Sequence, residues 1–205
     1  MNLHKIIFWL CILGLLLFGA CQNKQADVYT QDTHSPTGGI QVVVEIPAGT
    51  NHKIEFQPSS QQFVNDSIAG KERIINFLPY PGNYGFIPST MMDKKRGGDG
   101  DALDVLVIGE SVPTGQTIAT RPIGVLMLRD KGEMDSKIIA IPADSTLQVI
   151  NPKDYEDFFI RYNAAHHIIQ EWFMNYKGLG VMELVSWQDE QYALREIEKW
   201  QMSNE

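Results

Sequence analysis

The stretch from Gly97 to Ile108 constrains what this chain can fold into more than any other part of it. Three aspartates, Asp99, Asp101 and Asp104, fall within six residues, and an apolar run rich in β-branched side chains follows directly. This order predicts a loop that carries the three carboxylates and then enters a buried strand.

Two glycines in this loop decide how its acids can be arranged. Gly98 and Gly100 allow the backbone to bend, so we expect the three carboxylates to converge. Converging carboxylates repel each other unless a cation lies between them. Because the stretch contains no Cys or His, its hard oxygen ligands favour Mg²⁺, Mn²⁺ or Ca²⁺ over zinc.

Two other interpretations of the acidic loop compete with a catalytic metal site. One is a solvated acidic turn. The other is an EF-hand loop, but Leu103 would then take the fifth loop position, where an oxygen ligand is needed, and Asp104 the sixth, where glycine is needed. The register therefore argues against an EF-hand, and other parts of the chain must separate the remaining two interpretations.

The start of the chain predicts export. Residues 1–20 read as a signal peptide, with a short charged region at His4 and Lys5 and an apolar run from Ile6 to Phe18 that is too short to span a membrane. Cys21 follows the small residues Gly19-Ala20, which resembles a bacterial lipobox cleaved before a lipidated cysteine. We therefore expect an exported protein, lipid-anchored through Cys21 on the periplasmic or cell-envelope side of a bacterial membrane; the alternative is a plain secretory signal.

Composition bounds the rest of the chain. Residues 21–39 are polar and lack apolar periodicity, so they predict a flexible tether before a single domain at 40–205. The chain carries 17 basic and 25 acidic residues, a formal charge of −8, which argues against nucleic acid as a partner. An anionic substrate would need metals and local Lys or Arg to reverse the field at its site.

The predicted elements are mainly strands, followed by helices. Short β-branched or alternating segments predict strands at Val42 to Ile46, Lys53 to Phe56, Arg73 to Phe77, Leu103 to Ile108, Thr117 to Leu128 and Lys137 to Ile141. Their spacing favours a compact barrel or sandwich. From Asn151, read as an N-cap, the apolar period becomes helical, and a last helix is expected near Glu190 to Met202.

Seven segments together resemble one family. They are V-E-I-P from Val44, K-I-E from Lys53, Y-P-G-N-Y-G-F from Tyr80, D-G-D-A-L-D-V-L-V from Asp99, R-P-I-G-V-L from Arg121, D-x4-D-S-K from Asp130 and F-x2-Y-K from Phe173. In this order they resemble the soluble, Mg²⁺-dependent inorganic pyrophosphatases. The resemblance implies an α+β, mainly β fold: a five-stranded OB-like barrel with additional strands and two or three C-terminal helices packed on it.

The resemblance also implies a role for each acid and base. Hydrolysis of pyrophosphate to two orthophosphates would use a metal-activated water and no covalent intermediate, with Asp101 as general base and Tyr84 assisting. Several Mg²⁺ ions, or Mn²⁺, would be held by Asp99, Asp104, Asp130, Asp135, Glu55 and Glu45. The phosphoryl groups would be bound by Lys53, Arg73, Tyr84, Lys137, Tyr176 and Lys177. A homo-oligomer is implied as well, commonly a hexamer in bacterial members.

Alternatives and departures remain. The domain could be a non-catalytic barrel that binds divalent cations or a phosphorylated ligand, or a phosphohydrolase for another small polyphosphate or phosphate ester. Ala102 stands where the family usually has proline, and Lys71 could take the role of Arg73. His166 and His167 are adjacent on a helix and point about 100° apart, so we expect surface or subunit contacts rather than a shared metal.

Overall fold

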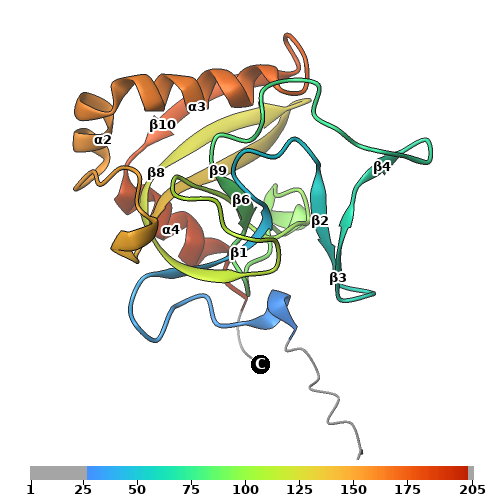
Figure 1. Cartoon of the computed structure of the whole chain (residues 1–205), viewed down its shortest axis with the longest axis horizontal. Coiled ribbons are helices and arrows are strands. Elements are labelled where there is room, and N and C mark those ends of the chain that lie inside the picture. Colours follow the sequence, from blue (N-terminus) through green and yellow to red (C-terminus); the bar gives the residue numbers. More distant parts are fainter. Residues whose placement is uncertain (1–26, 203–205) are drawn as a thin grey trace, which may run out of the picture.

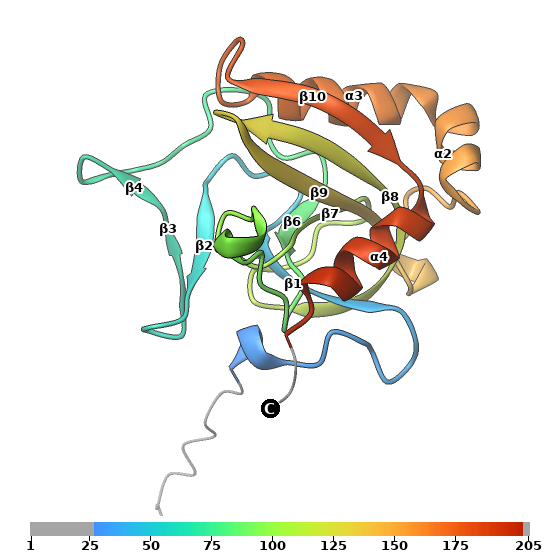
Figure 2. The same ribbon diagram turned by 180° about the vertical axis from the view of Figure 1, so that it is seen from behind.

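The chain closes a ring of five strands. In the computed structural model, which describes residues 27–202, the hydrogen-bonded order is β1 (Ile40–Ile46), β6 (Asn83–Phe86), β7 (Asp104–Val107), β9 (Glu133–Pro142) and β8 (Thr117–Asp130). β8 pairs back to β1 and so completes the barrel, while β10 (Met182–Gln188) adds to the outside of β8 (Figures 1 and 2). The predicted OB-like barrel is confirmed; β6 and β10 were not predicted as strands.

β8 is long enough to pair with three other strands. Its first residues pair with β1, its last ones pair with β10, and β9 runs antiparallel along most of its length. The β8–β9 register shifts between Pro122 and Gly124, where proline has no N–H to give to the ladder. One strand thus joins the barrel to β10.

Both faces of the sheet are buried, which explains the continuous apolar runs in the sequence. Val105 and Val107 of β7 pack in one core cluster together with Ile197 of α4 (Glu190–Trp200). Leu106, between them, packs in a second cluster with Phe173 of α3 (Asn163–Asn175). Alternate residues of β7 therefore belong to two different core clusters, each of which also contains residues of a helix, and β7 is buried on both faces where the acidic loop enters it.

The helical part begins later than the sequence predicted. Asn151 is not an N-cap: α2 (Tyr155–Arg161) is capped by Asp154, whose carboxylate accepts a hydrogen bond from the Asp157 N–H at 2.8 Å. A carboxylate satisfies the free N–H groups of a helix start, and also its positive end, better than the amide of Asn151. The last helix is confirmed as α4. Three 3₁₀ turns complete the helical elements of residues 27–202: η1 (Val28–Thr30), η2 (Lys94–Arg96) and η3 (Ser145–Leu147).

Two short ribbons form an arm on the side of the barrel opposite α2 (Figure 1). β2 (Ile54–Gln57) pairs with β3 (Gln62–Asn65), and β4 (Ser67–Ile68) pairs with β5 (Lys71–Glu72). The strand predicted at 73–77 is wrong, since only Ile74 forms an isolated bridge, to His52. Ile74 and Phe77 are exposed, and Ile75 between them is buried in the core without pairing as a strand.

The prediction that residues 21–39 form a free tether is wrong for the portion that the structure describes. Val28 is buried against the barrel, and the Thr33 hydroxyl donates a hydrogen bond to the Pro88 carbonyl at 3.0 Å. The sequence did not predict this packing because few residues of the segment are apolar. The predicted signal peptide and Cys21 lie outside the described residues. Within residues 27–202, no helix is long and apolar enough to cross a membrane.

The two adjacent histidines occupy different environments. His167 is exposed, but His166 is only 3% exposed and stacks on Trp187, with ring centroids 4.0 Å apart. The expectation of a surface position is therefore wrong for His166, which lies under β10 because α3 turns this face toward the sheet. Burial lowers the pKa of His166 to about 4, and the neighbouring His167 adds to the effect.

Candidate active site

A cavity of about 560 Å³ lies between the barrel and the arm. Its wall contains every residue to which the sequence assigned a metal, phosphate or proton-transfer role: Glu45, Lys53, Glu55, Arg73, Tyr84, Asp99, Asp101, Asp104, Asp130, Asp135, Lys137, Tyr176 and Lys177. They come from all five barrel strands, the arm, the acidic loop and the end of α3. The structure thus brings together side chains spread over more than half of the chain, while their individual roles remain predictions.

The acidic loop is held by close backbone contacts. A Cβ on Gly98 would lie 2.3 Å from the Met92 carbonyl oxygen, so only glycine fits there. Gly100 has φ +93°, a conformation that suits glycine. The Asp101 N–H then donates to Oδ1 of Asp99 at 3.0 Å. The loop glycines therefore bend the chain as predicted, and they aim Asp99 and Asp101 into the cavity.

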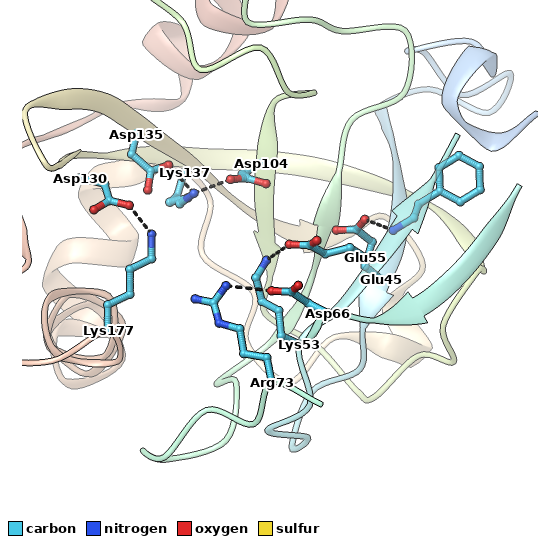
Figure 3. Close-up of polar contacts among 11 residues, drawn as sticks. Glu45, Lys53, Glu55, Asp66, Arg73, Asp104, Asp130, Asp135, Lys137 and Lys177 are labelled. Atoms are coloured by element: carbon cyan, nitrogen blue, oxygen red, sulfur yellow. Dashed lines mark hydrogen bonds and ion pairs between the residues drawn. The ribbon is translucent and has the colours of Figure 1, made fainter. Parts of the chain in front are cut away.

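The three loop carboxylates share the cavity without forming a tight cluster. Among residues 27–202, no three acidic, histidine or cysteine side chains lie close enough together to enclose one ion. The expected convergence is therefore only partial. Instead, the ammonium group of Lys137, whose side chain is 4% exposed, bonds to both Asp104 and Asp135 (Figure 3). Burial alone would lower the pKa of Lys137, but these two carboxylates raise it well above its usual value.

A second pair closes the side of the cavity near α3. Nζ of Lys177 donates to Oδ2 of Asp130 at 2.7 Å, and this bond lowers the pKa of the Asp130 carboxyl group (Figure 3). Oδ1 of Asp130 is buried, and no hydrogen-bond partner for it exists among the described residues. A buried carboxylate oxygen of this kind is costly unless a cation or another donor reaches it.

The opposite side carries two more ion pairs. Nζ of Lys53 lies 2.7 Å from Glu55, and the guanidinium of Arg73 lies 3.0 Å from Asp66 (Figure 3). The backbones of Lys53, Asp66 and Arg73 are also hydrogen-bonded to one another, which fixes their relative positions. Lys71 is exposed on β5 and does not line the cavity. Of the two candidates for the arginine role, the structure places Arg73 at the site.

Two deeply buried groups lie at the base of the cavity. The carboxylate of Glu45 accepts a hydrogen bond from the Phe56 N–H at 2.7 Å and so ties β2 to β1. Burial raises the pKa of Glu45 to about 8. Burial also raises the pKa of Tyr84 well above its usual value, and Asp104 adds to this effect. Tyr84 is therefore a neutral hydroxyl that can donate a hydrogen bond to an anion.

The charge of the cavity indicates what it can bind. Its wall carries eight carboxyl groups and five Lys or Arg side chains, a formal charge of −3. A polyanion would be repelled from such a wall unless divalent cations entered with it. Hard carboxylate oxygens, one of them buried with no partner within residues 27–202, fit Mg²⁺ or Mn²⁺. The residues present therefore fit the predicted metal ions.

Sequence reasoning assigned no role in the site to several residues of this wall: Tyr29, Phe56, Phe86, Ala102, Lys131, Glu133 and Met134. Asp66 lies outside the wall and pairs with Arg73, which lines it. Lys131, Glu133 and Met134 lie between Asp130 and Asp135 in the hairpin that joins β8 to β9. Because both aspartates were assigned to the site, this position could have predicted that the three residues lie near it. Tyr29 had no such signal, because it precedes every recognised motif and its position depends on tertiary packing.

Comparisons with known proteins agree with this arrangement. The family model described as "Inorganic pyrophosphatase" matches residues 42–205. Inorganic pyrophosphatases from Synechocystis sp. and Neisseria meningitidis are each 36% identical to the chain, over 79% and 80% of its length and 89% of their own. The crystal structure of inorganic pyrophosphatase from Thermus thermophilus superimposes with a TM-score of 0.71 at 28% identity, covering 84% of this chain and 95% of that one. This chain therefore belongs to the inorganic pyrophosphatase family.

Proposed function

We propose that the chain hydrolyses inorganic pyrophosphate to two orthophosphates and that it requires Mg²⁺. Family membership supports the reaction, and one observation carries the metal requirement: eight carboxyl groups and five Lys or Arg side chains line one cavity, with a formal charge of −3. A site for a neutral ligand would need neither group in such number. Pyrophosphate needs both, because cations must first offset the acids before the anion can enter.

The metal ions would be held by Asp99, Asp104, Asp130 and Asp135, with Glu55 and Glu45 at the edge of the site. Bound Mg²⁺ supplies charge neutralisation and lowers the pKa of a water molecule, which makes that water a nucleophile near neutral pH.

The cationic side chains would bind and orient the substrate. Lys53, Arg73, Lys137 and Lys177 each lie within ion-pair distance of a carboxylate, which holds them in place in the wall. In the substrate complex their remaining N–H groups would contact phosphoryl oxygens, and the hydroxyls of Tyr84 and Tyr176 would donate further hydrogen bonds. This arrangement would place positively charged side chains beside the leaving phosphate and stabilise its developing negative charge.

Asp101 would accept the proton of the attacking water. Its side chain is exposed to the cavity, and among the described residues no lysine or arginine forms an ion pair with it. Partial burial, followed by the negative charges of Asp104 and Glu55, raises the pKa of Asp101. A carboxylate that is unpaired and more basic than usual is suited to general-base catalysis. Water would attack phosphorus directly, so no covalent enzyme intermediate is required.

The proposal is tested by measuring phosphate release from pyrophosphate, tripolyphosphate and a phosphate monoester, with Mg²⁺ and with EDTA. Mg²⁺-dependent turnover that strongly prefers pyrophosphate supports it. Preference for another substrate would favour a different phosphohydrolase. Metal binding without turnover of any of the three would favour the non-catalytic barrel.

We propose further that the protein is exported and lipid-anchored through Cys21. The support is the sequence alone: the charged start, the apolar run and the small residues before the cysteine. Cell fractionation and lipid labelling test this, with Cys21→Ala as the variant. Loss of label and release from the membrane fraction are expected, and an unchanged membrane fraction would contradict the anchor.

We also propose a homo-oligomer. Phe159 and Ile160 on α2 and Ile168 on α3 are exposed apolar side chains on neighbouring helices, which supports an interface there. Light scattering coupled to size-exclusion chromatography tests it: Ile160→Lys should lower the molar mass. A monomeric wild-type protein would contradict the proposal.

A further inference from the structure

Tyr29 reaches the acidic loop from a segment that precedes the barrel and the residues matched by the family model. Its hydroxyl accepts a hydrogen bond from the Ala102 N–H at 3.0 Å, directly after Asp101. Its ring packs on Phe86, with centroids 5.1 Å apart, and both side chains line the cavity. The segment that the sequence predicted as a tether thus supplies part of the wall of the site.

The hydrogen bond is well placed to control the loop. Ala102 is 5% exposed, so its N–H lies away from water. On one side of it, the Asp101 carbonyl accepts a hydrogen bond from the Met92 N–H at 2.8 Å. On the other, the Leu103 N–H donates to the Thr90 hydroxyl at 2.9 Å. Tyr29 is therefore the side chain that holds the peptide unit joining Asp101 to Ala102.

The backbone around Tyr29 is itself hydrogen-bonded to Ser89, the neighbour of Thr90. Its carbonyl oxygen accepts a hydrogen bond from the Ser89 N–H at 2.9 Å, and the Ser89 hydroxyl donates to the Gln31 carbonyl at 2.8 Å. In Figure 1 the blue turn that is η1 (Val28–Thr30) lies below the barrel, and its Val28 packs in one core cluster with Val43 of β1 and Phe86 of β6. The hydroxyl is thus presented from a fixed backbone.

The identity of residue 102 makes the contact available. Proline, which the resembled motif usually carries here, fixes φ but has no N–H to donate. Alanine restores backbone freedom and adds a buried donor that needs an acceptor. The Tyr29 hydroxyl satisfies that donor and restrains the loop at the same point.

From this geometry we propose that Tyr29 is a positioning residue: through the Ala102 N–H it fixes the backbone that carries Asp101. The catalytic part of the inference rests on the proposed function, whereas the effect on the loop does not. The segment before β1 then contributes to catalysis in this chain by fixing the acidic loop.

The test is Tyr29→Phe in the full chain, because phenylalanine retains the ring contacts and removes only the hydroxyl. Amide hydrogen exchange, measured without metal or substrate, should accelerate about fivefold or more for residues 99–103, the effect of losing one ordinary hydrogen bond. The kcat for pyrophosphate at saturating Mg²⁺ should fall by a similar factor with KM unchanged.

Tyr162→Phe is the matched control. The Tyr162 hydroxyl also accepts a backbone hydrogen bond, from Asn151 at 3.3 Å, but it does not line the cavity. This variant should leave exchange in residues 99–103 and kcat unchanged. Equal effects of the two variants on that loop, or no change in exchange with Tyr29→Phe, would overturn the proposal.

Ala102→Pro supplies a second check, because it removes the donor. Adding Tyr29→Phe to Ala102→Pro should then change neither loop exchange nor kcat any further. If Tyr29→Phe has its full effect in the proline background, the hydroxyl does not act through this N–H and the proposal fails. If the wild-type chain releases no phosphate while loop exchange responds as expected, the proposed function fails and the positioning contact stands.

Discussion

Nζ of Lys177 lies 2.7 Å from Oδ2 of Asp130, while Oδ1 of the same carboxylate is buried and has no hydrogen-bond partner among residues 27–202. One oxygen is thus bonded within the protein, and the other has an unmet capacity to accept a hydrogen bond or bind a cation. The pair thereby joins an anion-binding group to a proposed metal ligand. The same combination occurs at Lys137, which bonds to Asp104 and Asp135.

Asp130→Asn tests this relationship. The amide keeps the shape of the side chain but removes the charge that attracts both Lys177 and a divalent cation. We expect the Mg²⁺ concentration for half-maximal activity to rise at least about tenfold, the lower end of the loss seen even for groups that only support metal ligands.

Asp144→Asn is the control for this substitution. Asp144 caps η3 and does not line the cavity, so its variant should keep the Mg²⁺ dependence of the wild type. A Mg²⁺ titration of phosphate release measures both. An unchanged midpoint for Asp130→Asn would remove Asp130 from the proposed ligands.

Gly98→Ala should damage the site through the backbone. The added Cβ would meet the Met92 carbonyl oxygen at 2.3 Å, so the loop would have to move away from its support. We expect a loss of kcat of tenfold or more, on the order of 1.4 kcal/mol of transition-state stabilisation. Gly70→Ala adds a methyl group in open space on the arm and should reduce kcat far less. Equal activity of the two variants would show that this loop tolerates displacement.

His166 predicts how stability depends on pH. Its pKa falls to about 4 in the folded protein, from an ordinary value near 6.5, because burial disfavours the charged ring. The unfolded chain therefore binds more protons between these values, and stability falls as the pH is lowered through that window. The contribution of His166 to the free energy of unfolding should be about 2 kcal/mol lower at pH 5 than at pH 7.

Denaturant unfolding of the wild type, His166→Gln and His167→Gln at both pH values measures this contribution. His166→Gln should lose that part of the pH dependence, and His167→Gln, at an exposed position, should retain most of it. An identical pH dependence in all three proteins would contradict a buried, neutral His166.

The sequence allowed the site to be predicted better than the strands. Asp101, Lys137 and Lys177 belong to short motifs in which several charged residues lie close together in the sequence, and each of them lines the cavity. β6 was missed as a strand because Gly85 lowers strand propensity. That glycine is required by the fold, since a Cβ there would lie 1.9 Å from the Val43 carbonyl oxygen in β1.

What could not be predicted depends on contacts between distant segments. Tyr29 sits in a polar stretch, and nothing local indicates that its hydroxyl meets Ala102, 73 positions later. The same holds for the ion pair between Arg73 and Asp66, which requires the turn between β4 and β5. Such positions follow from tertiary packing, which pattern and propensity do not encode.

The most direct test of the central claim is phosphate release from pyrophosphate by the wild type and by Asp101→Asn, each with Mg²⁺ and with EDTA. We expect turnover that requires Mg²⁺ and falls about 10²- to 10⁴-fold in the variant, the range for losing a general base. Mn²⁺ binding and folding should be retained, since Asp101 is not among the proposed metal ligands. Turnover that survives EDTA would rule out the metal requirement, and a variant as active as the wild type would rule out Asp101 as the general base.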